Sequence, residues 1–302
     1  MASKRCPRRG RGMIGQPLDI RRALTEKPEP IDYVLPSLPA RCLGALVAPG
    51  GVGKSSLVTQ ISVEMALGLP LVGGVHAARA PAKVVLLLAE EDVQLCVWRL
   101  QALKHLLETE RDKIDDERLA LLESNLQIFP LAGSDVSVLT SRRATKVADQ
   151  IKRVAEGSRL LVVDPLRRFY DGDENDSSTV TAVVQTFERI CRDTGTTIVM
   201  TQHTTKSSVL DGRGDLQQAS RGSSALPDGV RWQANLVPTD GSGTTTASRP
   251  SGPKTRNFHL FIPKANYAPP TEPVELRRVE SGLFQPTYSA PSVSKSRGGG
   301  RG

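Results

Sequence analysis

The chain is poor in cysteine and in aromatic residues. Its four cysteines lie far apart and form no C-x-x-C pair, which is typical of the reducing cytoplasm, where we expect the protein. Aromatic residues make up 4% of the sequence. Because few bases could stack on aromatic rings, any bound nucleic acid would be held mainly through its phosphates.

Long apolar runs are also missing. No stretch approaches the roughly 18 residues that a membrane span requires, and the charged N-terminus lacks the apolar segment of a signal peptide. We therefore expect a soluble protein that is neither exported nor inserted into a membrane.

Acidic residues are absent from both ends of the chain. Five basic residues in the first dozen positions and three in the last twenty account for the whole formal net charge of +8. The body between them is formally neutral. A DNA site in the folded part would therefore be a local basic patch.

The length of 302 residues suits one large α/β domain with appendages. Residues 1–30 are rich in Arg, Gly and Pro and are expected to form a basic flexible arm. The folded domain is expected to span residues 31–286, with a flexible loop at 239–256. Residues 287–302 are expected to form a disordered basic tail.

A glycine-rich loop that ends in Lys54-Ser55 follows the first strong apolar run, at 43–48, and precedes a helical pattern. Glycines let consecutive backbone N–H groups turn onto a phosphate, and the positive end of the helix faces the same charge. Lys54 would reach the β- and γ-phosphates of ATP, and the Ser55 hydroxyl would hold Mg²⁺. Ala48 stands where the strict motif has its first glycine. The predicted ATP-binding residues are Pro49, Gly50, Gly51, Val52, Gly53, Lys54, Ser55 and Ser56.

Short apolar runs alternate with helical patterns in the rest of the domain. Strands are expected at 43–48, 83–89, 126–129, 159–164 and 196–201, and helices at 54–68, 92–123 with a break, 142–156 and 178–193. This alternation predicts an α/β P-loop NTPase with a mostly parallel sheet and helices on both faces. Later strands at 230–232, 257–262 and 274–285 would add antiparallel strands.

Acidic residues end two of the expected strands, where ligands bind in such sheets. Asp164 closes an apolar strand and would serve the Mg²⁺ shell. Glu90 follows the strand at 83–89 and is the predicted catalytic base, with Glu91 as its rival. The alternatives are a turn-forming Asp before Pro165, and acids that only favour the start of the next helix.

Polar residues that could sense or complete the site follow the next strand. Gln202 and His203 end it, and His203 is the predicted γ-phosphate sensor. Arg231 is the predicted arginine finger, which would act on the ATP of a neighbouring subunit. Arg221 is a second candidate for this role. A surface position without function is the alternative for both arginines.

The segment from Thr204 to Ser224 is polar, rich in glycine and basic at two points. It could line a channel for single-stranded DNA, with contacts to phosphate that do not depend on base sequence. The predicted DNA-binding residues are Lys206, Arg213 and Gln217. The alternative is a surface loop without function.

Several segments, taken in order, resemble the RepA family of ring-shaped replicative helicases of broad-host-range IncQ-type plasmids. The most specific of these are Gln-Ala-Ser-Arg-Gly-Ser-Ser at 218–224, Val-Arg-Trp-Gln at 230–233 and Lys-Ala-Asn-Tyr at 264–267. The resemblance runs from about residue 31 to 284. Gln202 departs from it, because the family can have a second His there.

The resemblance implies a RecA-like core, a homohexamer and ATP-driven 5′ to 3′ movement on single-stranded DNA. It also implies that Lys54 binds phosphate, Glu90 is the base, Asp164 serves Mg²⁺, His203 senses the nucleotide and Arg231 acts in trans. Primase and origin-binding replication proteins are the expected partners.

Two other functions compete with a DNA-unwinding motor. A RecA-like DNA-dependent ATPase could act as a regulatory or partition-type switch and never unwind DNA. A P-loop kinase of small molecules fits poorly, because no lid or acceptor-binding segment is evident. Strand displacement on a forked duplex separates the first two.

Overall fold

The computed structural model describes residues 17–72, 76, 79–110, 113–204, 217, 223–239 and 256–287. The chain divides into two compact units, Met1–Asp32 and Tyr33–Gly302. The described part of the first unit holds helix α1 (Ile20–Thr25), which begins where the Asp19 side chain accepts a hydrogen bond from the Arg22 backbone N–H. The predicted residues Lys206, Arg213 and Arg221, residues 240–255 of the expected loop and the tail after residue 287 lie outside the described residues.

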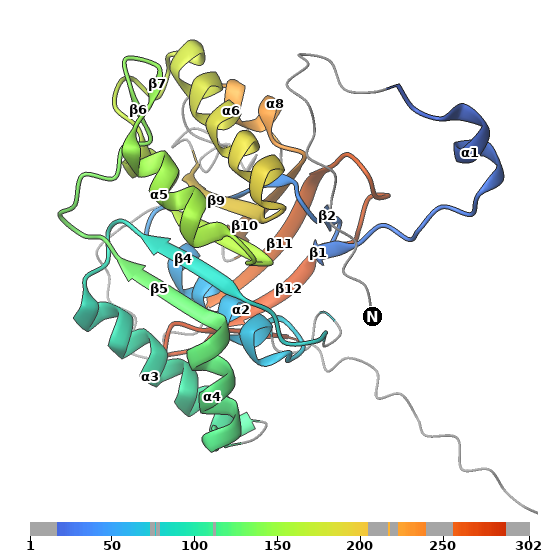
Figure 1. Ribbon diagram of the computed structural model, residues 1–302. Helices are drawn as coiled ribbons and strands as arrows, with labels where there is room; N and C mark the ends of the chain where they lie inside the picture. The colour runs from blue at the N-terminus through green and yellow to red at the C-terminus, as the bar shows by residue number, and fades with distance from the viewer. Residues whose placement is uncertain are drawn as a thin grey trace, which may run out of the picture. The chain divides into compact units, whose positions relative to one another are not determined.

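The second unit is built on a nine-stranded sheet in the order β13-β12-β11-β10-β3-β9-β8-β4-β5 (Figure 1). Six neighbouring strands run parallel: β10 (Trp232–Pro238), β3 (Leu43–Ala48), β9 (Thr197–His203), β8 (Leu160–Asp164), β4 (Val84–Leu88) and β5 (Leu126–Pro130). Three antiparallel strands extend the sheet beyond β10: β11 (Arg256–Ala265), β12 (Val274–Arg278) and β13 (Phe284–Pro286). The predicted fold class is confirmed.

Helices cover both faces of the sheet, as the alternation predicts (Figure 1). They are α2 (Lys54–Leu67), α3 (Val93–Glu110), α4 (Asp116–Asn125), α5 (Lys146–Ala155), α6 (Ser177–Thr194), α8 (Ala225–Gly229) and the 3₁₀ helix η2 (Leu166–Phe169). Alternate residues of β3 enter two cores: Leu43 and Val47 pack in the core of α5 and α6, whereas Leu46 packs in the core of α2. Side chains of a strand alternate in this way because the backbone is pleated.

Two expected element boundaries are wrong. The helix expected at 142–156 begins only at Lys146, after a hairpin of β6 (Leu139–Thr140) and β7 (Arg143–Ala144). The Thr145 hydroxyl accepts a hydrogen bond from the Val147 N–H and so starts the helix. The single strand expected at 274–285 is two strands, β12 and β13, joined by a turn in which Gly282 has a φ of 85°. A second hairpin joins β1 (Tyr33–Leu35) to β2 (Leu38–Pro39).

None of the helices in the described residues is long and apolar enough to cross a membrane.

Candidate nucleotide-binding site

The glycine loop joins β3 to α2 at the carboxyl edge of the sheet, as predicted. Gly51 and Gly53 have φ angles of 75° and 106°, a left-handed conformation that glycine adopts without strain. The first hydrogen bond of α2 runs from the Leu57 N–H to the Gly53 carbonyl, so earlier N–H groups remain available at the helix start. The loop therefore has the backbone of a phosphate-binding site.

Lys54 is 6% exposed and lies inside this loop. Its amine donates hydrogen bonds to the carbonyls of Ala48 and Pro49, at 3.2 Å each, and lies 3.1 Å from Nδ1 of His203. Burial lowers the pKa of Lys54 to about 8, against the opposing charges of Asp164 and Glu90. The structure thus brings the four predicted residues Lys54, Glu90, Asp164 and His203 together.

Neighbouring strands position the acidic residues. Asp164 ends β8, is 3% exposed and accepts a hydrogen bond from the Thr201 hydroxyl on β9. Glu90 follows β4, the next strand along the sheet, and its side chain is exposed. The two carboxylates therefore differ in environment, since one is buried and anchored while the other lies open to water.

Glu91 is the buried member of the Glu90–Glu91 pair. Both of its carboxylate oxygens bind the Arg99 guanidinium of α3, with Nε of Arg99 3.2 Å from Oε2. The same guanidinium donates a hydrogen bond to the Ser56 hydroxyl of the phosphate loop. Sequence reasoning missed Arg99, although it lies two helical turns beyond Glu91 on α3.

The described residues fit Mg²⁺ held together with a nucleotide. No group of three or more His, Cys, Asp or Glu side chains among them forms a metal cage. Mg²⁺ commonly binds one or two protein oxygens together with substrate phosphates. Ser55 and Asp164 supply that kind of oxygen, so they would hold the ion.

Arg231 lies apart from the other predicted residues. It immediately precedes β10, and its N–H donates to the Leu43 carbonyl at the start of β3. The phosphate loop begins at the other end of β3, roughly 17 Å away for a six-residue strand. Arg231 is exposed and lies at the amino edge of the sheet, beyond the reach of an arginine side chain from its own loop.

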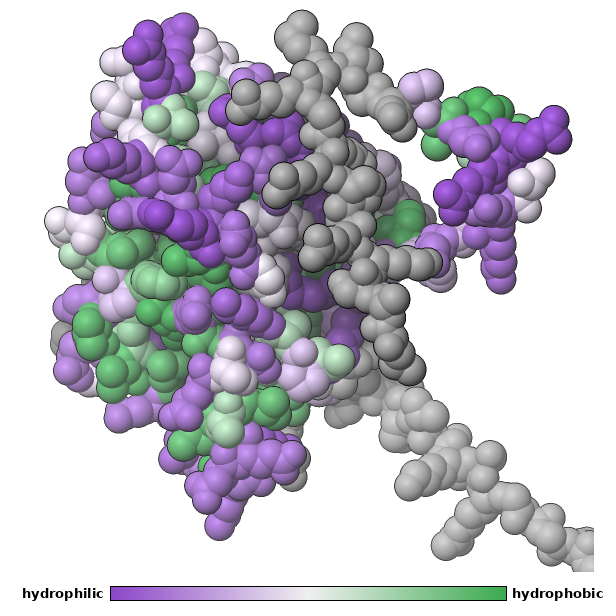
Figure 2. All heavy atoms as spheres, viewed as in Figure 1, coloured by the Kyte–Doolittle hydropathy of each residue, from purple (hydrophilic) through white to green (hydrophobic). Residues whose placement is uncertain are grey.

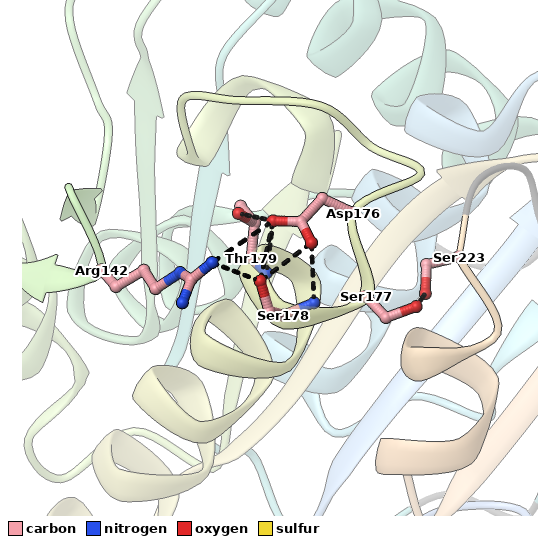
Figure 3. A network of polar contacts seen from close by, with 6 residues as sticks. All are labelled: Arg142, Asp176, Ser177, Ser178, Thr179 and Ser223. Carbon is pink, nitrogen blue, oxygen red and sulfur yellow. Dashed lines mark hydrogen bonds and ion pairs between the residues drawn. The ribbon is translucent and has the colours of Figure 1, made fainter.

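Both ends of the candidate DNA segment are anchored near the site. Thr204 donates its N–H to the Ala48 carbonyl at 3.1 Å. At the other end, the Ser223 hydroxyl lies 2.8 Å from that of Ser177 at the start of α6, beside the contacts of Arg142 with Ser178 and Asp176 (Figure 3). The exposed end of this segment therefore rests on a network of short polar side chains.

Gln217 is the one predicted DNA-binding residue inside the described part of the chain. Its side-chain amide donates to the Pro227 carbonyl of α8 at 3.2 Å. Its own carbonyl accepts a hydrogen bond from the Gln233 amide of β10, at 3.0 Å. These contacts tie Gln217 to the fold beside the strand that Arg231 precedes.

The C-terminal strands also reach the phosphate loop, which the sequence did not reveal. Arg278, at the end of β12, donates from Nη1 to the Gly51 carbonyl at 3.2 Å. The Gln60 side chain of α2 bonds both the N–H and the carbonyl of Phe284 on β13, at 2.9 and 2.8 Å. The antiparallel extension is thus joined to the helix that carries Lys54.

Solved structures share this fold at low sequence identity. The chain is similar to a protein solved as its ATPase domain, with a TM-score of 0.54 and 16% identity over 82% of this chain and 85% of that one. It is also similar to a DnaB-like replicative helicase whose structure is described with its interactions with primase. That match has a TM-score of 0.55 and 16% identity, and it covers 82% of this chain and 57% of the helicase.

A family model gives the wider relationship. It is described as an AAA domain and matches residues 12–209, well over half of the chain. The matched range contains the phosphate loop, Glu90, Asp164 and His203, whereas Arg231 and the antiparallel strands lie beyond it. The chain therefore belongs to the AAA-domain family.

Proposed function

We propose that the protein is an ATP-dependent DNA helicase that works as a homohexameric ring, of the RepA type that serves plasmid replication in the cytoplasm. The observation that carries this proposal is the separation of two sets of residues. Lys54, Glu90, Asp164 and His203 gather around one phosphate loop, whereas Arg231 lies exposed at the opposite edge of the sheet. A finger in that position can serve only the site of another subunit.

Within each site, the residues divide the work of hydrolysis. Lys54 neutralises charge on the β- and γ-phosphates. Mg²⁺, held through Ser55 and Asp164, would neutralise further phosphate charge. The exposed Glu90 orients the attacking water and accepts its proton, because both oxygens of Glu91 are already engaged by Arg99.

His203 and Arg231 would complete the cycle. His203 faces the Lys54 amine and senses the γ-phosphate at the point where the candidate DNA segment begins. The guanidinium of Arg231 stabilises transition-state charge on the ATP of the next subunit. Lys206, Arg213 and Gln217 are proposed to contact the phosphates of single-stranded DNA, and primase or origin-binding proteins to act with the ring.

An exposed apolar surface supports assembly into oligomers. Figure 2 shows apolar side chains gathered around α3. Among them, Val93 is 65% exposed and Trp98 is 62% exposed. Large exposed apolar side chains that lie together commonly mark protein–protein contacts.

Strand displacement tests the proposal directly. With ATP and Mg²⁺, the protein should release one strand of a forked DNA duplex, and its mass measured with nucleotide should correspond to six copies. Hydrolysis that single-stranded DNA stimulates, without strand displacement, would instead support the regulatory or partition-type ATPase. A monomeric mass under all conditions would contradict the ring.

A further inference from the structure

Arg278 makes a contact with the phosphate loop that the proposed function does not use. Nη1 donates to the Gly51 carbonyl and Nε to the Gly282 carbonyl, both at 3.2 Å. The guanidinium also lies against Gly53, where an added Cβ would come within 3.1 Å of Nε and 3.2 Å of Cζ. The side chain thus touches the loop at two of its glycines.

The fold holds Arg278 at this place. Gln60, on the helix that follows the loop, bonds both backbone groups of Phe284, the Cα partner of Arg278 on β13. Phe284 is fully buried and packs edge-on against Phe258 with 5.5 Å between ring centroids. Because buried aromatic packing fixes the two strands, the guanidinium is preorganised beside the loop.

The charge around Arg278 favours an anion. Its charged neighbours are Arg99 and Arg256, which together with burial lower the pKa of Arg278. Within the described residues no carboxylate pairs with it, whereas Glu91 neutralises Arg99. Two of the five guanidinium N–H groups bond carbonyls, so the others remain for a ligand. A half-buried cation among cations is costly unless an anion binds it.

Resting on the proposed function, we propose that Arg278 is a nucleotide-binding residue of its own subunit that contacts the phosphate nearest the ribose. Lys54 serves the β- and γ-phosphates from inside the loop. Arg278 approaches from outside, at Gly53, and the adjacent Gly282 lies on the side of Ser56. The backbone N–H groups of such loops hold the α- and β-phosphates, so this side corresponds to the α-phosphate.

The test compares ADP affinity between two neighbouring arginines of β12. Arg278→Ala should raise the Kd for ADP about tenfold or more, because a charge-assisted hydrogen bond to phosphate is lost. Turnover at saturating ATP should stay within about twofold, since ground-state binding is what changes. Arg277→Ala is the matched control, because Arg277 is exposed and contacts Gln285 rather than the loop, and it should bind ADP like the wild type.

Two further measurements separate a direct contact from an effect on loop shape. Arg278→Lys keeps the charge without the planar fork and should restore part of the affinity. Inorganic pyrophosphate, which can occupy the Lys54 side alone, should bind Arg278→Ala as it binds the wild type. An equal loss of pyrophosphate and ADP affinity, or an unchanged ADP Kd, would overturn this proposal. A wild-type protein that binds no ADP would instead overturn the proposed ATPase.

Discussion

The carboxyl and amino edges of the parallel sheet carry different parts of one active site. At the carboxyl edge, Lys54 is buried and lies 3.1 Å from His203, and both Glu90 and Asp164 act on its charge. At the amino edge, Arg231 is exposed, and its N–H is hydrogen-bonded to the start of β3. One chain thus contains every catalytic group of the proposed reaction but cannot bring them together.

This difference explains why oligomerisation and catalysis should depend on each other. A phosphate loop with its base needs only the local geometry of strands that end beside one another. A finger at the far edge needs a second copy of the chain, whose exposed arginine enters the pocket. Experiments that disable one edge at a time can therefore break the comparison or sharpen it.

The largest effect is expected at the carboxyl edge itself. Lys54→Ala should abolish ATP turnover, because it removes the buried cation that faces the phosphates. The fold should remain, since the side chain contributes little to the apolar core. ATP hydrolysis and thermal unfolding measure the two effects, and unchanged hydrolysis would contradict the ATPase assignment.

At the amino edge, Arg231→Ala should lower turnover by about 10³- to 10⁵-fold while nucleotide affinity stays unchanged. The finger stabilises charge that develops in the transition state and contributes little to ground-state binding. Single-turnover hydrolysis and ADP binding measure the two quantities. Retained activity in this variant would remove the finger role.

Mixing two inactive variants shows in which subunit Arg231 acts. Glu90→Gln has its defect in its own pocket, whereas Arg231→Ala has it in the pocket of a neighbour. Mixed rings then contain some junctions with both Glu90 and Arg231, so hydrolysis should partly recover. Mixed oligomers that form, by mass, and stay inactive at all ratios would contradict independent sites completed in trans.

A smaller effect distinguishes the two adjacent glutamates. Glu90→Gln should lower kcat by about 10²- to 10⁴-fold, as expected for loss of a general base. Glu91→Gln should keep most of kcat but lower the melting temperature, because it weakens the buried ion pair with Arg99. The opposite pattern would make Glu91 the base.

The smallest effect is a pH dependence that arises from the burial of Lys54. Its pKa is lowered to about 8, so the amine loses its charge above pH 8, and ADP affinity should fall by up to about tenfold per pH unit there. The Lys54→Ala variant should lack this slope. Titration calorimetry between pH 7 and 10 measures it, and a flat profile in the wild type would contradict it.

Stability should change in the opposite direction over the same range. The unfolded chain, in which Lys54 has its ordinary pKa of 10.5, binds more protons than the folded chain between about pH 8 and 10.5. The contribution of Lys54 to the free energy of unfolding therefore rises with pH in this window. Chemical unfolding of the wild type and of Lys54→Ala isolates that contribution.

The sequence alone determined the parallel core and most of its site. Apolar runs placed β3, β4, β5, β8 and β9 correctly, because short buried strands between helices have a distinctive composition. The residues that end these strands meet at one edge of any parallel sheet. Lys54, Asp164 and His203 could therefore be named without coordinates, and Glu90 could be narrowed to one of two residues.

Only the tertiary structure decided what depends on contacts between distant segments. The choice of Glu90 over Glu91 rests on Arg99, and the position of Arg231 rests on the pairing of β10 with β3. Arg278 meets Gly51 across more than two hundred residues, and no local pattern announces such a contact. Periodicity records which face of an element is buried, whereas the order of strands and the partners of a surface arginine are set by packing.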